Sequence, residues 1–116
     1  MSDAFNPARS RNNPDTLATF VQAPIRGELL DVPGIGKETK NILIENGINN
    51  TFQLLGKFLM LKDDEVESVE LCDRFWYWLE SIGTTKGHRS SVVQSVACKL
   101  DASYPGMYDS SRYDVE

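Results

Sequence analysis

The sequence predicts an all-α fold, with a single domain of five helices that contains a helix-hairpin-helix motif. Apolar residues recur at helical spacing in several segments, and no run alternates apolar and polar residues as a half-buried strand would. Glycine-containing turns such as Asn46-Gly47 separate these segments. The length of 116 residues suits one domain with one modest core.

The N-terminal residues 1–13 are polar and rich in Asn, Arg, Ser and Pro, so we expect a flexible tail there. A helix then opens at Pro14 and ends before Pro24, because proline fits the first helical turn and disfavours helix in the residue before it. Its apolar side consists of Leu17, Phe20 and Val21. A connector follows over 25–33, with a short helical turn near Glu28–Asp31.

The spacing of apolar residues predicts four more helices, over 37–46, 51–61, 63–82 and 88–100. Asp63, Asp64 and Glu65 place negative charge where a helix N-terminus favours it, which is why we begin the 63–82 helix there. The helical domain therefore spans 14–102. An acidic C-terminal tail over 103–116 follows, docked in part by Tyr104 or Tyr108.

The composition excludes several classes of protein. No apolar run approaches the roughly 20 residues that a membrane span needs, so we expect no membrane insertion. Cys72 and Cys98 are too few for a disulfide framework and are interpreted as reduced core thiols of an intracellular protein. With His88 as the only histidine, we expect no metal site and no cofactor.

The charge is unevenly distributed along the chain. Lys and Arg number 12 and Asp and Glu 17, which gives a net charge of −5. Residues 63–80 sum to −6, whereas 34–62 sum to +2 and 83–100 to +3. This pattern predicts a basic face on an acidic body.

The most informative segment is Leu29–Leu43, which has the pattern of a helix-hairpin-helix. Two glycines in Gly34-Ile35-Gly36 allow the backbone to approach a phosphate closely, and the helix that follows directs N–H groups and its positive dipole end at the anion. Lys37 adds a cation there, and Ile35 is expected to point inward. The alternative is a tight turn whose glycines serve packing alone. Residues 83–89 offer a second glycine-containing helix start with two bases.

No catalytic constellation stands out in the sequence, and we expect a protein that is not an enzyme. Helix-hairpin-helix glycosylases place a catalytic aspartate about 20 residues after the hairpin, but the corresponding segment 52–58 contains no acid.

The stretch from Thr19 to about Asp101 resembles the barrier-to-autointegration factor family. Its most specific match is Leu55–Lys62, which follows the family's LGxFLxLK pattern. The other matches are Phe20-Val21 before Pro24, the hairpin Gly34-Ile35-Gly36, the pair Trp78-Leu79, and Lys86 with Arg89.

The resemblance implies a five-helix, SAM-like homodimer that binds double-stranded DNA without sequence preference and bridges two duplexes. It assigns phosphate contacts to Gly34, Ile35, Gly36, Lys37, Thr85, Lys86 and Arg89. We add Lys40 to this set because, with Lys37, it can compensate for lysines that the family has in the hairpin helix and this chain lacks. It assigns the dimer interface to Leu55, Gly56, Phe58, Trp78 and Leu79. It also implies LEM-domain and lamin-type partners and a chromatin-associated protein of the nucleus and cytoplasm.

The chain departs from the family's pattern at several positions. Thr16 and Asn41-Ile42 replace family lysines, and Ser2 and Ser10 are the only candidates for its N-terminal phosphorylation cluster. Together with the net charge of −5, these departures leave an alternative, a dimeric protein-interaction module of the same fold with weak or lost DNA binding. An accessory domain of a repair enzyme is disfavoured because the chain has no second hairpin.

Overall fold

The computed structural model describes residues 4–113, and within this range it contains five α-helices, three short 3-10 helices and no strand. The predicted all-α fold is confirmed. The elements are η1 (Pro7–Arg9), α1 (Pro14–Gln22), η2 (Leu29–Asp31), α2 (Lys37–Glu45), α3 (Thr51–Met60), α4 (Ser68–Ser81), α5 (Lys86–Ser103) and η3 (Ser110–Arg112).

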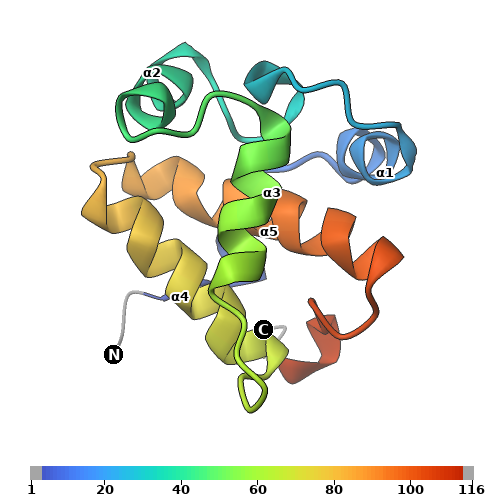
Figure 1. Cartoon of the computed structure of the whole chain (residues 1–116). Coiled ribbons are helices and arrows are strands. Elements are labelled where there is room, and N and C mark those ends of the chain that lie inside the picture. Colours follow the sequence, from blue (N-terminus) through green and yellow to red (C-terminus); the bar gives the residue numbers. More distant parts are fainter. Residues whose placement is uncertain (1–3, 114–116) are drawn as a thin grey trace.

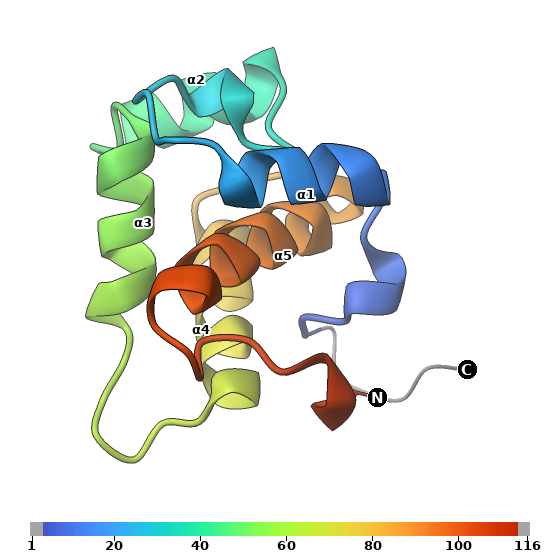
Figure 2. The ribbon, with the colours of Figure 1, turned by 90° about the vertical axis from the view of Figure 1, so that its right-hand side faces the viewer.

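Helix α5 is the centre of the fold. It packs against α1, α3, α4 and η1, and Figures 1 and 2 show these elements around it. Because α5 is covered on several sides, most of its residues from Arg89 onwards are buried, including small polar ones such as Ser91 and Ser95. The largest fully buried side chains come from the helices around it and include Trp76, Phe58 and Phe75.

Helix α1 has the predicted bounds and is held at both ends. The Asn13 side chain accepts hydrogen bonds from the N–H groups of Asp15 and Thr16, which satisfies donors of the first turn. At the other end, Lys99 of α5 donates to carbonyl oxygens of Phe20, Val21 and Ala23. A cation fits this end because the C-terminal carbonyls of a helix have no partner of their own.

Helix α4 begins later than the sequence suggested, at Ser68 rather than at 63. The acidic residues before it form a turn, closed by a hydrogen bond from the Val66 N–H to the Asp63 carbonyl at 3.1 Å. Arg74 of α4 reaches back to the Asp63 carboxylate at 3.3 Å and the Leu61 carbonyl at 3.0 Å. The acidic residues therefore lie in a turn before α4, where Asp63 pairs with Arg74, and they do not form the first turn of the helix.

The described part of the N-terminal segment differs from the expected flexible tail. The Phe5 side chain is buried, and its N–H donates to the Asp73 carboxylate at 3.1 Å. Burial at this contact raises the pKa of Asp73. The Ser10 hydroxyl donates to the Gln94 side-chain oxygen at 2.6 Å, whereas Ser2 lies outside the described residues. One aromatic anchor and a few polar contacts thus order a segment whose composition is polar.

The described part of the C-terminal segment also packs on the domain. The Asp101 carboxylate accepts hydrogen bonds from three successive N–H groups, those of residues 106–108, and so turns the chain back after α5. Tyr108 and Tyr113 then pack on the core, whereas Tyr104 is exposed. Of the two tyrosines expected to dock this segment, Tyr108 does so and Tyr104 does not.

Both cysteines are unpaired, as expected for reduced core thiols. Burial raises the pKa of Cys72 to about 12 and that of Cys98 to about 11. Both groups are therefore protonated at neutral pH and are poor nucleophiles.

Replacing Phe5 by alanine should lower the free energy of unfolding by about 1–3 kcal/mol. This is less than the usual ~3–5 kcal/mol for a buried phenylalanine, because a terminal segment can detach without unfolding the rest. The exposed Tyr104→Ala is the control and should change the value by less than about 0.5 kcal/mol. Urea titrations followed by circular dichroism measure both; equal effects would contradict an anchoring role for Phe5.

Candidate nucleic-acid interface

The hairpin between η2 and α2 is a tight turn whose inner side is apolar. The Ile35 N–H donates to the Val32 carbonyl at 3.0 Å, and the Ile35 side chain is buried in the core cluster. The expected inward direction of Ile35 is therefore observed. Gly36 follows as the N-cap of α2, so the helix begins directly where the turn ends.

Gly34 is required by its contact with α5. Its φ is +100°, a backbone conformation that side chains disfavour. A Cβ built on Gly34 would lie 2.8 Å from the Cβ of Ser91 and 3.0 Å from the backbone nitrogen of Val92. For this glycine the packing interpretation holds, because the hairpin could not approach α5 with a side chain here.

Gly36 is in the opposite situation. It is exposed, its backbone is extended (φ −100°, ψ −172°), and a Cβ there would meet nothing within 4 Å. No side chain caps the first turn of α2, so the N–H groups that lack helical partners in this turn face an open space. Lys37 is exposed in the same turn. The surroundings of Gly36 can therefore accept an anion.

Lys40 lies one turn further along α2 and is engaged in an ion pair. Its Nζ is 2.9 Å from the Glu28 carboxylate. That carboxylate also accepts a hydrogen bond from the Leu30 N–H at 3.0 Å, and these two contacts lower the pKa of Glu28. The pair links α2 to η2, so Lys40 contributes less positive charge to the hairpin than the sequence suggested.

The start of α5 places Thr85 and Lys86 at the surface. Thr85 is the N-cap of the helix and Lys86 its first residue; both are exposed, and no side chain caps this end either. The preceding Thr84 is buried, and its hydroxyl donates to the Leu79 carbonyl at 2.9 Å. The turn between α4 and α5 is thus fixed from within while its outer side stays accessible.

Arg89 points into the protein rather than toward solvent, in contrast to its expected role as a phosphate contact. Its guanidinium lies over the Trp76 ring, 4.7 Å from the centroid, and donates to the Thr84 carbonyl at 2.7 Å. A Glu80 carboxylate oxygen lies 3.8 Å away. Only 8% of the Arg89 side chain is exposed, so in this position it supports the α4–α5 turn.

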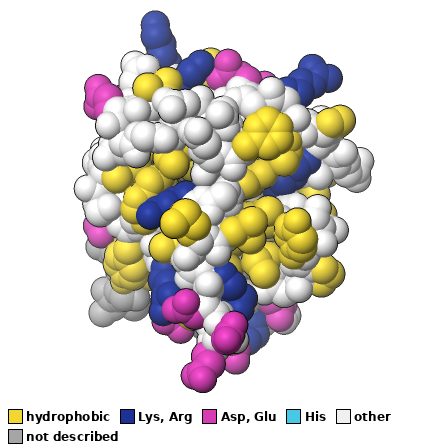
Figure 3. All heavy atoms as spheres, viewed as in Figure 1, with side chains coloured by type: hydrophobic (Ala, Val, Ile, Leu, Met, Phe, Trp, Pro, Cys, Tyr) yellow, Lys and Arg dark blue, Asp and Glu magenta, His cyan; other side chains and the backbone are white. Residues whose placement is uncertain are grey.

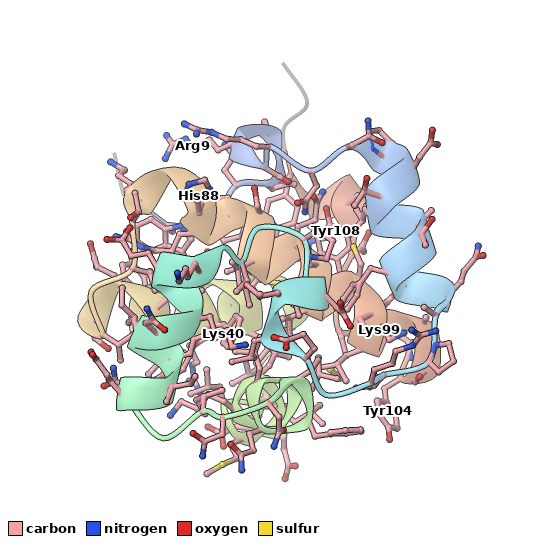
Figure 4. The ribbon with its side chains drawn as sticks, turned by 90° about the horizontal axis from the view of Figure 1, so that it is seen from above. Arg9, Lys40, His88, Lys99, Tyr104 and Tyr108 are labelled. Carbon is pink, nitrogen blue, oxygen red and sulfur yellow. The ribbon has the colours of Figure 1, made fainter. Side chains whose placement is uncertain are left out.

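The basic character of segment 83–100 is consequently divided between distant places. Arg89 is internal, and Lys99 lies at the α1 C-terminus, well away from the α5 N-terminal turn that carries His88 (Figure 4). Of the three bases in this segment, only Lys86 remains on the surface beside the hairpin. The predicted basic face is therefore smaller than the charge sum implies.

A polar network joins the hairpin, α5 and the N-terminal segment. The Ser95 hydroxyl donates to the Pro33 carbonyl of the hairpin at 2.8 Å. The Asn12 side chain donates to the Ser95 hydroxyl at 3.1 Å and to the Ser91 carbonyl at 3.0 Å, and the Arg11 N–H donates to the Ser91 hydroxyl at 2.7 Å. The sequence analysis did not assign a functional role to this segment, although residues 4–13 contain two arginines, three asparagines and no acid.

The expected dimer-interface residues fall into two groups. Leu55, Phe58 and Leu79 are buried within the chain's own core. Gly56 and Trp78 lie nearer the surface, and a Cβ on Gly56 would meet nothing within 4 Å. Trp78 is partly covered by Lys57, whose Nζ lies 5.1 Å from the ring centroid. Only Gly56 and Trp78 are therefore positioned to touch another molecule.

An exposed apolar stripe runs along the same side of α3. Phe52, Gly56, Leu59 and Met60 follow the i, i+4, i+7, i+8 spacing of one helix face, and Phe52 and Met60 are 58% and 79% exposed. The space-filling view shows hydrophobic side chains gathered over the face that α3 crosses (Figure 3). An apolar face of this kind marks an interaction site more often than a solvated surface.

The family model for barrier to autointegration factor matches residues 14–100. The chain belongs to this family. The matched segment contains the hairpin, the α3 stripe and the start of α5. No curated protein and no solved structure gives a significant match to the chain. Barrier-to-autointegration factors are non-enzymatic DNA-binding proteins associated with chromatin, and membership indicates a role of this kind.

Two further properties bear on the class of the protein. Within residues 4–113, no helix has both the length and the apolar character required to cross a membrane. In the same range, no three His, Cys, Asp or Glu side chains are grouped so that they could hold a metal ion.

The two glycines of the hairpin should respond differently to a methyl group. Gly34→Ala combines an unfavourable φ with overlap against Ser91 and should cost about 2–4 kcal/mol of unfolding free energy. Gly36→Ala places its methyl group in open space and should cost less than about 1 kcal/mol. Urea denaturation of both variants measures the difference, and a loss at Gly36 as large as that at Gly34 would contradict this assignment.

Proposed function

We propose that this protein binds double-stranded DNA without sequence preference, as a homodimer that bridges two duplexes, in the nucleus and cytoplasm. The observation that carries the proposal is the open, uncapped N-terminus of α2 at Gly36, in a hairpin packed on α5. Such a site binds the phosphate backbone, which every sequence shares.

In the proposed complex one phosphate lies at Gly36 and receives N–H groups from the first turn of α2, with the Lys37 ammonium beside it. A second phosphate contact comes from Thr85 and Lys86 at the start of α5. Gly34 and Ile35 hold the turn in shape, Gly34 by its close approach to α5 and Ile35 through its buried side chain. Lys40 is a weaker contributor because Glu28 already pairs with it.

Bridging requires a second copy of the chain, and we assign the contact between copies to the apolar stripe of α3. Gly56 permits close approach of another backbone, and Phe52, Met60 and Trp78 supply apolar area around it. Leu55, Phe58 and Leu79 are not part of this proposed contact, because their side chains are buried in the core beneath the stripe. LEM-domain and lamin-type proteins are further partners that we propose from family membership.

A second candidate function is a dimeric protein-interaction module with weak DNA binding. The net charge of −5 favours it, as do the internal position of Arg89 and the ion pair of Lys40. This candidate predicts the same dimer through α3 without salt-sensitive DNA binding, so one titration separates the two functions.

Gly36→Glu should abolish DNA binding, because it places a carboxylate where the phosphate would lie. Wild-type affinity should fall with salt, and the slope of log K against log concentration should be about 2 or more in magnitude, as the two proposed phosphate contacts require. Fluorescence anisotropy with a duplex of ~20 base pairs at ~50 and ~200 mM salt measures both quantities.

The matched control is Ala102→Glu, which adds the same charge at an exposed position near the far end of α5. It should bind within about two-fold of wild type, since exposed charges beyond a Debye length of ~10 Å are screened. A folded Gly36→Glu protein that binds as well as wild type would refute the hairpin as the site.

Gly56→Glu should convert the dimer into a folded monomer. The side chain has room in the single chain but would bury an unpaired carboxylate between two copies. Sedimentation velocity gives the mass, circular dichroism gives the helicity, and Ala102→Glu again serves as the control. A wild-type chain that sediments as a monomer would argue against both candidate functions.

A further inference from the structure

We propose that the N-terminal residues Arg9 to Asn12, here called the arginine arm, supply additional phosphate contacts beside the start of α5. The inference rests on the proposed function and extends its DNA-binding surface to Arg9 and Arg11. The arm precedes residues 14–100, the part of the chain that the family model matches.

The arm is fixed to α5 through its backbone and its uncharged side chains. The Arg11 N–H and the Asn12 side chain bind Ser91, and the Ser10 hydroxyl binds Gln94. The contacts to Ser91 lie one to two helical turns from the start of α5. Because these bonds use no charged group, both guanidinium groups are left for other contacts.

The Arg11 side chain extends toward the first turn of α5. Its Nη2 atom would lie 3.1 Å from a Cβ built on Gly87, so the guanidinium occupies the place that a side chain would take there. Gly87 follows Lys86 directly, and Arg11 therefore lies beside the second proposed phosphate contact. The absence of a side chain at Gly87 thus leaves room for the guanidinium of Arg11, a residue from the N-terminal segment.

Arg9 lies at the same end of the molecule. It is exposed, and Figure 4 shows it beside His88, one residue after Gly87. Its element η1 packs on α5, which keeps Arg9 near this turn. The two arginines and Lys86 are thereby gathered around one helix start.

The charges around the arm support binding of an anion rather than an internal role. Within residues 4–113, neither Arg9 nor Arg11 forms an ion pair, and residues 4–13 contain no acid. Arg74, Arg89 and Arg112 all have a carboxylate within 4.0 Å. The arm thus concentrates positive charge in a chain whose total is −5.

The arm adds two cations to the proposed phosphate contacts. Arg89 is internal and Lys40 forms an ion pair with Glu28, so of the four expected basic contacts Lys37 and Lys86 are the exposed ones. The hairpin and the arm both contact α5 within the stretch from Lys86 to Ser95. This stretch is about 14 Å long at ~1.5 Å per residue. This length corresponds to about four base pairs of one strand at ~3.4 Å each.

The test uses the full chain with Arg9 and Arg11 both replaced by glutamine, which retains length and hydrogen-bonding capacity. Binding to the ~20-base-pair duplex at low salt should weaken roughly ten-fold, and the salt slope should decrease in magnitude by about 1 to 2. The matched control is Arg26→Gln, the same change at an exposed position on the connector after α1. It should leave the affinity within about two-fold of wild type and the salt slope within about 0.5 of the wild-type value.

A second variant separates charge from folding. Replacing both arginines by lysine retains the charge, and binding should stay within about three-fold of wild type while the glutamine variant is weakened. Equal losses in the lysine and glutamine variants would mean that the arginines act through structure, which would overturn the inference.

The outcomes also distinguish this inference from the proposed function. If wild type binds and Gly36→Glu does not, but the double glutamine variant matches wild type in affinity and slope, the arm inference is wrong and the hairpin site stands. If the folded wild-type chain does not bind DNA at ~50 mM salt, the proposed function fails, and the inference with it.

Discussion

The close approach of Gly34 to Ser91 fixes the geometry on which the rest of the candidate site depends. At Gly34 the backbone of the hairpin packs directly on α5, with no side chain between them. The chain then continues into α2, and Gly36 at its start faces away from α5 into open space. The same Ser91 accepts the Arg11 N–H through its hydroxyl. The hairpin and the arm therefore contact the same residue of α5, Ser91, which fixes their positions relative to each other.

Local sequence was sufficient to predict that there are five helices and which side of the hairpin is buried, but it placed the start of α4 five residues too early. Helical spacing and turn residues define α1, α2 and α3, and Ile35 between two glycines leaves one apolar side chain to bury. The inward turn of Arg89 could not be predicted, because it depends on the Trp76 ring from another helix. The docking of Phe5 depends likewise on Asp73, which lies 68 residues away along the chain.

Charge sums along the sequence were a poor guide to the surface because individual cations serve different purposes. Lys99 satisfies carbonyl oxygens at the end of α1, and Arg74 holds the acidic turn before α4. In each case the cation is bound within the protein, although the charge sum of its segment still includes it. An acidic protein can nevertheless present a phosphate-binding face, since a short Debye length of ~10 Å makes the nearest charges decisive.

The aromatic contact between the two ends of the described chain has a topological consequence. The Phe5 ring lies 5.4 Å from that of Tyr113, centroid to centroid, so both ends meet on one side of the domain. A short linker could therefore join them and close the chain into a ring. New termini could then be placed at the exposed turn around Gly47, between α2 and α3. The result would be a circular permutant with the same fold, in which α3 comes first and α2 last.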